Sequence, residues 1–251
     1  MSEEERRETL DEAKILEVLN HPNICRFREV YKTKKGQLCI VMDFADGGDV
    51  NQVIKERNKK DENGNRNPMT EDELLNYFTQ MCLAVKHIHD RKILHRDIKS
   101  HNFFLTKKGI VKLGDFGIAR VLSNTRSKAK TVVGSPSYLS PEIINNEAYS
   151  FKSDIWSLGI VFHEMAALEA PFQGSSFNKL LSRIVKSKPR PVQAQYSPAV
   201  TSLLKLMLSK DPNLRPSIHQ ILKTPVIEKR IQRFLQEDTF KEEFAHGLLH
   251  N

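Results

Sequence analysis

The apolar positions in the first part of the chain predict one helix followed by two strands. Ser2 and Glu5 have the spacing of a helix capping box, and an apolar stripe of helical period follows them. A His-Pro-Asn run ends this pattern. Residues 24–31 and 38–44 then alternate partly between apolar and polar side chains, and a polar turn at 34–37 joins them, which predicts a β-hairpin.

The rest of the chain has mainly the apolar period of helices. A second capping box at 70–73 precedes a long apolar stripe, and the run 155–168 is apolar on nearly all sides, so this helix belongs inside a domain. A Ser-Pro pair at 197–198 has the N-cap and N1 residues of another helix, and 226–235 predicts a last one. Residues 93–149 have the pattern of short strands and loops. The whole pattern predicts an α+β fold, with a small αβ piece first and a mostly helical part after it.

The composition is that of a globular domain in a reducing compartment. The 251 residues are 39% apolar and 28% charged, which allows a sizeable core without disulfides. No apolar run reaches the ~18 residues of a membrane helix, and the charged segment 1–7 lacks the apolar core of a signal peptide. The three cysteines cannot all pair and have no CxxC spacing. We therefore expect a cytoplasmic protein with no membrane partner.

The charge balance has two interpretations. The 39 Lys and Arg residues exceed the 31 Asp and Glu residues, which gives a net charge of +8 at pH 7. Such an excess fits either a polyanionic partner such as nucleic acid or a nucleotide, or a solvated surface of mixed sign. The densest charged stretch, 55–62, mixes both signs, which favours the second interpretation. We therefore expect no nucleic-acid partner.

The strongest chemical signal is an ordered set of short motifs. The stretch 95–102 reads His-Arg-Asp-Ile-Lys-Ser-His-Asn, Asp-Phe-Gly follows at 115–117, and Ser-Pro-Glu follows at 140–142. A lone Asp-Phe-Gly is weak evidence, but the three motifs in this order are not accidental. Their order and spacing match the protein-kinase signature set.

The whole chain from residue 1 to about 235 resembles a eukaryotic protein kinase domain, and more narrowly the NIMA-related (NEK) serine/threonine kinases. The resemblance to this subfamily rests on the segments 1–7, 40–43, 47–49, 95–99, 115–120 and 131–136. It implies a protein-kinase-like fold. Residues 1–44 would form a partial N-lobe (helix C plus about two or three strands), 45–235 a complete, mostly α-helical C-lobe, and 236–251 a C-terminal tail.

The resemblance implies that the γ-phosphoryl group of Mg·ATP is transferred to Ser or Thr hydroxyls of protein substrates. Asp97 would orient the attacking hydroxyl and accept its proton, and Lys99 would neutralise the γ-phosphate. Asn102 and Asp115 would supply the oxygen ligands that Mg²⁺ requires. A lysine at position 99 resembles the serine/threonine kinases rather than the tyrosine kinases.

The nucleotide site follows from the same resemblance. Backbone groups of Asp43 and Ala45 would bind adenine, Met42 would lie behind the ring, and Asp49 would bind ribose. Asp49 also has the position of a helix N-cap, and the two roles are compatible. Glu12 matches the helix glutamate that pairs with a strand lysine in the family.

Regulation and structural support are also implied. A phosphate on Thr131, with Ser127 and Ser135 as weaker candidates, would pair with Arg96, added by an upstream kinase or by autophosphorylation in trans. The residues with an implied structural role are His95, Phe116, Glu142, Asp154 and Arg215. His95 and Phe116 resemble members of a stacked apolar spine, and Glu142 and Arg215 resemble a buried ion pair.

Two parts of the family pattern are missing from this sequence. It contains neither a Gly-rich GxGxxG loop nor a VAIK lysine, so Glu12 has no partner before it. The favoured explanation is that the sequence is a fragment whose N-terminal strands lie upstream. The alternative is a natural, catalytically inactive kinase-like module that binds proteins. The subfamily resemblance also implies a cytoskeletal or ciliary location.

Overall fold

The computed structural model describes residues 18–114, 136–235 and 244. The helix expected near the N-terminus and most of the C-terminal tail lie outside these residues. Within the described ranges, no helix has both the length and the apolar character needed to cross a bilayer.

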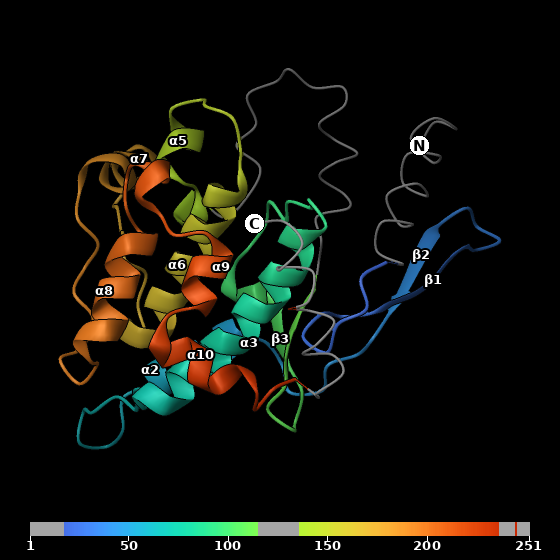
Figure 1. Ribbon diagram of the computed structural model, residues 1–251, viewed down its shortest axis with the longest axis horizontal. Coiled ribbons are helices and arrows are strands. Elements are labelled where there is room, and N and C mark those ends of the chain that lie inside the picture. Colours follow the sequence, from blue (N-terminus) through green and yellow to red (C-terminus); the bar gives the residue numbers. More distant parts are fainter. Residues whose placement is uncertain (1–17, 115–135, 236–243, 245–251) are drawn as a thin grey trace.

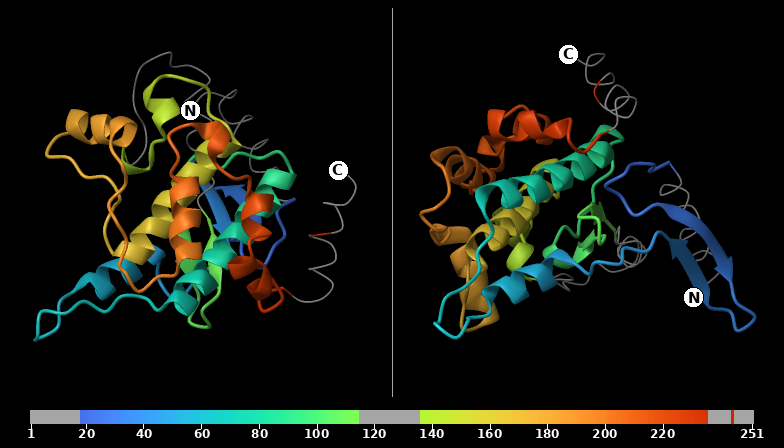
Figure 2. Two further views of the ribbon diagram at one scale, coloured as in Figure 1. Left: turned by 60° about the vertical axis from the view of Figure 1, so that its left-hand side comes forward. Right: turned by 90° about the horizontal axis from the view of Figure 1, so that it is seen from below.

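The predicted hairpin is present and is the main element of the N-terminal part. Strand β1 (Phe27–Lys32) pairs antiparallel with β2 (Leu38–Met42), with Phe27 opposite Met42 and Lys32 opposite Leu38. Gly36 has a positive φ of 80° in the connecting turn, a conformation that glycine adopts without strain. The hairpin projects away from the helical part of the molecule (Figures 1 and 2).

A short extended segment before β1 joins the hairpin to the helical part. The Cys25 N–H donates to the Leu113 carbonyl over 2.8 Å, and the Leu113 N–H donates to the Asn23 carbonyl over 2.8 Å. Leu113 belongs to a second antiparallel pair, formed by β3 (Phe103–Leu105) and β4 (Val111–Leu113). The segment therefore lies alongside β4, parallel to it, and fixes the start of β1.

The remaining elements are mostly helical, as expected for a C-lobe. In the ranges that the structure describes, the α-helices are α2 (Val50–Asn58), α3 (Glu71–Asp90), α5 (Pro141–Ile144), α6 (Phe151–Ala167), α7 (Phe177–Lys186), α8 (Pro198–Met207), α9 (Ile218–Leu222) and α10 (Pro225–Ile231). The same ranges contain the 3-10 turns η1 (Ser100–Asn102), η2 (Pro136–Tyr138) and η3 (Pro212–Leu214). The α+β class expected from the sequence is confirmed.

Sequence signals at the helix starts are confirmed in atomic detail. The Glu73 N–H donates to Thr70 Oγ1 over 3.2 Å, and the Thr70 N–H donates to Glu73 Oε2 over 3.0 Å, so α3 begins with the predicted capping box. Ser197 caps α8 with Pro198 at the first helical position. These bonds satisfy N–H groups that have no partner inside the helix.

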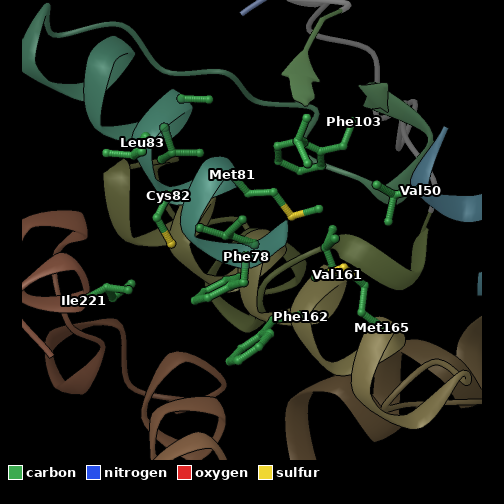
Figure 3. Packing of buried hydrophobic residues seen from close by; sticks show 14 of the residues in the cluster. Val50, Phe78, Met81, Cys82, Leu83, Phe103, Val161, Phe162, Met165 and Ile221 are labelled. Carbon is green, nitrogen blue, oxygen red and sulfur yellow. The ribbon is translucent and has the colours of Figure 1, made fainter. Parts of the chain in front are cut away.

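The core lies between α3 and α6. The rings of Phe78 on α3 and Phe162 on α6 stack with centroids 3.8 Å apart and an interplanar angle of 10° (Figure 3). Both side chains are fully buried, as are Met81 and Val161 beside them. Burial of each such side chain stabilises the fold by about 1.5–3 kcal/mol. The nearly all-round burial of α6 explains why its sequence is apolar on nearly all sides.

Candidate active site

The loop between α3 and β3 is attached to the core through one carboxylate. Asp154 on α6 is fully buried and accepts four hydrogen bonds. The His95 N–H donates to Oδ2 over 3.0 Å and the Arg96 N–H donates to Oδ1 over 3.1 Å. The Tyr149 hydroxyl donates to Oδ1 over 2.5 Å, and His89 Nε2 lies 3.0 Å from Oδ2. The first two residues of the His-Arg-Asp motif are thereby fixed to α6.

This cluster also explains how the Asp154 carboxylate stays charged inside the protein. Burial alone would raise the pKa of Asp154, but hydrogen bonds and the nearby His89 and His95 bring it below its ordinary value. His89 is a direct partner of Asp154, although no sequence motif marks it. No local pattern separates it from the other histidines of α3.

Asp97, Lys99 and Asn102 meet at the end of this loop. Lys99 Nζ lies 2.8 Å from Asp97 Oδ2. Asn102 Nδ2 donates to the Asp97 carbonyl over 2.9 Å and approaches Asp97 Oδ2 at 3.3 Å. Asn102 is buried, whereas the Asp97 and Lys99 side chains are 12% and 21% exposed. The three residues expected to carry the chemistry therefore lie within hydrogen-bond distance, and two of them reach solvent.

The preceding motif residues support this arrangement. Arg96 has a positive φ of 64°, which costs on the order of 1 kcal/mol for a residue other than glycine. Its N–H bond to Asp154 holds this conformation. His95 Nδ1 accepts the Asp97 N–H over 3.3 Å, and His95 Nε2 lies 3.3 Å from the Gly114 carbonyl. Both ring nitrogens are thus engaged by backbone groups, as expected for a structural histidine.

The chain leaves β4 beside Asn102, because the Gly114 N–H donates to the Asn102 carbonyl over 3.0 Å. Four expected site residues lie outside the described residues: Glu12, Asp115, Phe116 and Thr131. Their implied roles remain predictions.

Residues 43–49 form the segment after β2 that was expected to bind a nucleotide. Asp43 Oδ1 accepts hydrogen bonds from Arg28 Nη2 at 2.6 Å and Nε at 2.9 Å, and Asp43 Oδ2 lies 3.4 Å from Lys112 Nζ. Burial acts to raise the pKa of Asp43, but Arg28 and Lys112 lower it below its ordinary value. In the part of the chain that the structure describes, the Ala45 N–H has no backbone partner. The Asp43 side chain thus anchors the segment, together with the Asp43 N–H, which donates to the Arg26 carbonyl over 2.9 Å.

Asp49 has the N-cap geometry that the sequence predicts. Its Oδ1 accepts the Gln52 N–H over 2.9 Å at the start of α2. Just before it, the Gly47 N–H donates to the Leu105 carbonyl over 2.7 Å, and a Cβ on Gly47 would lie 2.8 Å from that oxygen. Only glycine allows this close approach, which fastens the segment to β3.

The expected buried pair between Glu142 and Arg215 is present. Arg215 Nη1 and Nη2 each lie 2.7 Å from one carboxylate oxygen of Glu142, and the side chains are 0% and 4% exposed for Arg215 and Glu142. Burial would raise the pKa of Glu142, but the hydrogen bonds from Arg215 and Ser153 hold it below its ordinary value. The pair links α5 to the turn after η3.

With this geometry established, comparison with known proteins identifies the family. The chain belongs to the protein kinase family, since residues 1–227 match the family model described as protein kinase domain. It is similar to serine/threonine-protein kinase Nek1 of Mus musculus, with 45% identity over 246 residues that cover 98% of this chain and 20% of the relative. It is also similar to Nek5 of Homo sapiens (43% over 248 residues, 98% and 34%) and Nek3 of Mus musculus (47% over 211 residues, 84% and 40%).

These matches confirm the resemblance to the NIMA-related serine/threonine kinases. The chain spans about a fifth to two fifths of the length of these relatives. The family of this chain therefore rests on a match over most of its own length.

Proposed function

We propose that this chain carries the catalytic part of a serine/threonine protein kinase that transfers the γ-phosphoryl group of Mg·ATP to protein hydroxyls. The observation that carries the proposal is the approach of Asp97, Lys99 and Asn102 within hydrogen-bond distance on a loop fixed to the core. Phosphoryl transfer has a loose transition state, and catalysis depends mainly on positioning and charge neutralisation. The loop supplies groups for both tasks.

Each of the three residues has a defined task. Asp97 accepts a hydrogen bond from the substrate hydroxyl, turns its oxygen toward the phosphorus, and takes its proton as the new bond forms. Lys99, 2.8 Å from the Asp97 carboxylate, holds that carboxylate in place and offers positive charge to the transferring phosphate. Asn102 fixes the Asp97 backbone through Nδ2.

The residues present fit a magnesium nucleotide. Because Asn102 Nδ2 donates to Asp97, the amide oxygen Oδ1 remains as a hard oxygen ligand of the kind Mg²⁺ prefers. Asp115 would be the second ligand. Mg·ATP, when bound, supplies the transferable phosphoryl group and a metal that neutralises its charge. The Asp43 and Ala45 backbone would hold adenine, and Asp49, whose Oδ1 is used in the helix cap, would offer its other oxygen to ribose.

Control by phosphorylation is part of the proposal. A phosphate on Thr131 would pair with Arg96, whose backbone is fixed to Asp154 directly beside the proposed base. The phosphate would come from an upstream kinase or from a second copy in trans. We also propose a cytoplasmic location with cytoskeletal or ciliary association, on the similarity to the NIMA-related kinases alone.

The test is transfer of labelled phosphate from ATP to a generic protein substrate, with the chain extended upstream by its own coding sequence. Asp97→Asn is expected to lower the rate at least 10³-fold without changing thermal stability by more than a few degrees. Asp61→Asn, in the exposed loop after α2, is the matched control and should retain full activity. An unchanged rate in Asp97→Asn would refute the assignment.

The second candidate is a kinase-like module that binds proteins without catalysis. It is favoured by the lack of GxGxxG and VAIK motifs in the 251 residues. It predicts that the 251-residue chain transfers no phosphoryl group and acts through protein contacts. Transfer by the 251-residue chain itself would discard it.

A further inference from the structure

A second network of hydrogen-bonded side chains contacts the catalytic loop, separate from the one around Asp154. The hydroxyl of Tyr138 on η2 donates to Glu164 Oε2 on α6 over 2.7 Å. The same hydroxyl lies 2.8 Å from Ser100 Oγ, and the Ser100 N–H approaches it at 3.4 Å. Ser157 Oγ on α6 donates to the Tyr138 carbonyl over 3.0 Å, so α6 holds both ends of the tyrosine. One phenol thus connects α6 with the loop.

The direction of these bonds follows from the donors. Tyr138 has one hydroxyl proton and gives it to Glu164, so its oxygen is left to accept from Ser100. An oxygen that donates to a carboxylate becomes a better acceptor, which strengthens the bond from Ser100. Ser100 is almost fully buried, so no solvent competes for its side chain.

Glu164 is the last residue of this hydrogen-bond network, and its buried carboxyl group has an unusual environment. Within the described residues, no lysine, arginine or histidine forms an ion pair with it. Burial raises the pKa of its carboxyl to about 7, although the hydrogen bond from Tyr138 acts in the opposite direction. Burial and the Glu164 charge also raise the pKa of Tyr138, so the phenol keeps its proton. The network is therefore a hydrogen-bonded support rather than an ion pair.

The position of Ser100 shows what the support holds. Ser100 follows Lys99 directly and begins the 3-10 turn that ends at Asn102. Asp154 fixes the start of the loop at His95 and Arg96, and among the described residues its hydrogen bonds to the loop end there. The Tyr138 hydroxyl is a second hydrogen-bonded anchor for the part with Lys99 and Asn102, beside the bonds inside the loop, its junction with β3 and β4, and the packing of η1 against α2.

We propose that Glu164 and Tyr138 are positioning residues of the kinase reaction, and that they fix the Lys99–Asn102 half of the catalytic loop through Ser100. This inference rests on the proposed function for its effect on rate, but its structural part can be tested without activity. Neither residue touches the reacting atoms. Their loss is expected to lower kcat and leave the KM for ATP nearly unchanged.

The key variant is Tyr138→Phe, which keeps the ring and removes the bridging oxygen. The matched control is Tyr196→Phe, because Tyr196 is also buried and its hydroxyl donates to the Met69 carbonyl over 2.9 Å, outside the catalytic loop. Both variants lose one buried hydroxyl, so they should lose similar thermal stability. Glu164→Gln is the conservative variant, because its amide oxygen can still accept from Tyr138.

Two measurements test whether Tyr138 holds the catalytic loop and whether this support matters for the reaction. By hydrogen exchange of the 251-residue chain, peptides covering 96–102 should exchange about tenfold faster in Tyr138→Phe than in the wild type, and at the wild-type rate in Tyr196→Phe. In the active, upstream-extended chain, kcat should fall about tenfold in Tyr138→Phe. The conservative variant Glu164→Gln should retain most of the wild-type kcat. The KM for ATP should stay within twofold in both variants.

Each outcome decides the inference. Unchanged loop exchange in Tyr138→Phe overturns it, whether or not the protein is active. Faster exchange with an unchanged kcat also overturns it, because the loop would then be supported but not positioned for the reaction. If the wild type transfers no phosphate, the proposed function fails, while the exchange experiment still decides whether Glu164 and Tyr138 hold the loop.

Discussion

Replacing Arg215 by methionine is expected to lower the free energy of unfolding by about 3–5 kcal/mol. Arg215 donates to both oxygens of Glu142, and it also donates to the carbonyls of Ser209 (2.8 Å), Lys152 (2.9 Å) and Lys210 (3.2 Å). Methionine fills much of the space but has no donor. It leaves the buried Glu142 carboxylate with the hydroxyl of Ser153 as its remaining side-chain donor.

The magnitude follows from the burial of the pair. A carboxylate that is 4% exposed regains little hydration when its partner is removed, so most of the desolvation cost is uncompensated. The carbonyls that lose a donor place the expected cost toward the upper end of the range. A domain of this size has about 5–15 kcal/mol of stability in total, so the variant should be marginal at 37 °C.

The assay is urea unfolding at pH 7 of the wild type, Arg215→Met, Glu142→Gln and the double variant. The double variant should be more stable than the sum of the single losses predicts, with a coupling of at least 2 kcal/mol. Arg190→Met is the control, because Arg190 is 47% exposed beside Glu169 and should contribute at most about 1 kcal/mol. A loss below 1 kcal/mol in Arg215→Met, or additive single losses, would refute the reasoning.

The pH dependence of the same pair gives an independent check. The pKa of Glu142 is lower in the native state than its ordinary value of 4.5. The unfolded chain therefore takes up a proton first as the pH falls, so the contribution of Glu142 is present above about pH 4.5 and is lost below it. The stability difference between wild type and Glu142→Gln should shrink as the pH falls through this range.

Three further predictions concern single sites. Thr70→Ala removes the capping box of α3 and should lower the free energy of unfolding by about 1 kcal/mol, measured by thermal unfolding. An unchanged stability would mean that the capping box is dispensable. Phe78→Ala should lower the free energy of unfolding in urea by about 3–5 kcal/mol, because the Phe78 ring stacks on Phe162. A loss near zero would contradict the packing of this core. Burial raises the pKa of Glu164 from 4.5 to about 7, so the native state binds its proton more tightly. Wild-type stability relative to Glu164→Gln should therefore fall by up to about 3 kcal/mol between pH 5 and 8, and a constant difference would contradict the assignment.

Elements with a local signal were predictable from the sequence. Thr70, Ser197 and Asp49 mark helix starts through contacts with residues three positions away, and such contacts can be read from spacing. Helices α7 and α9 were not predicted. Helix α7 fully buries only Ile184, and α9 has five residues, so neither has a long enough apolar stripe to be recognised.

The candidate site likewise has a part that the sequence predicts and a part that it does not predict. Asp97, Lys99 and Asn102 lie within six residues, so the motif contains the chemistry, and family resemblance gives the roles. The supports of the loop come from far away in the chain. Glu164 follows Ser100 by 64 positions, and nothing in its neighbourhood in the sequence marks it as a partner. Tertiary packing alone brings it to the loop.

The attachment of the loop to Asp154 has a consequence for the order of folding. The bonds to His95 and Arg96 join residues that are 59 and 58 positions apart, so they close a long stretch of chain that includes β3 and β4. Such a closure becomes favourable only after α6 has packed against α3, because the entropy of the intervening chain opposes it until then. Competence for catalysis should therefore arise with the last cooperative step of C-lobe refolding. A collapsed intermediate with native helices would still have no ordered catalytic loop.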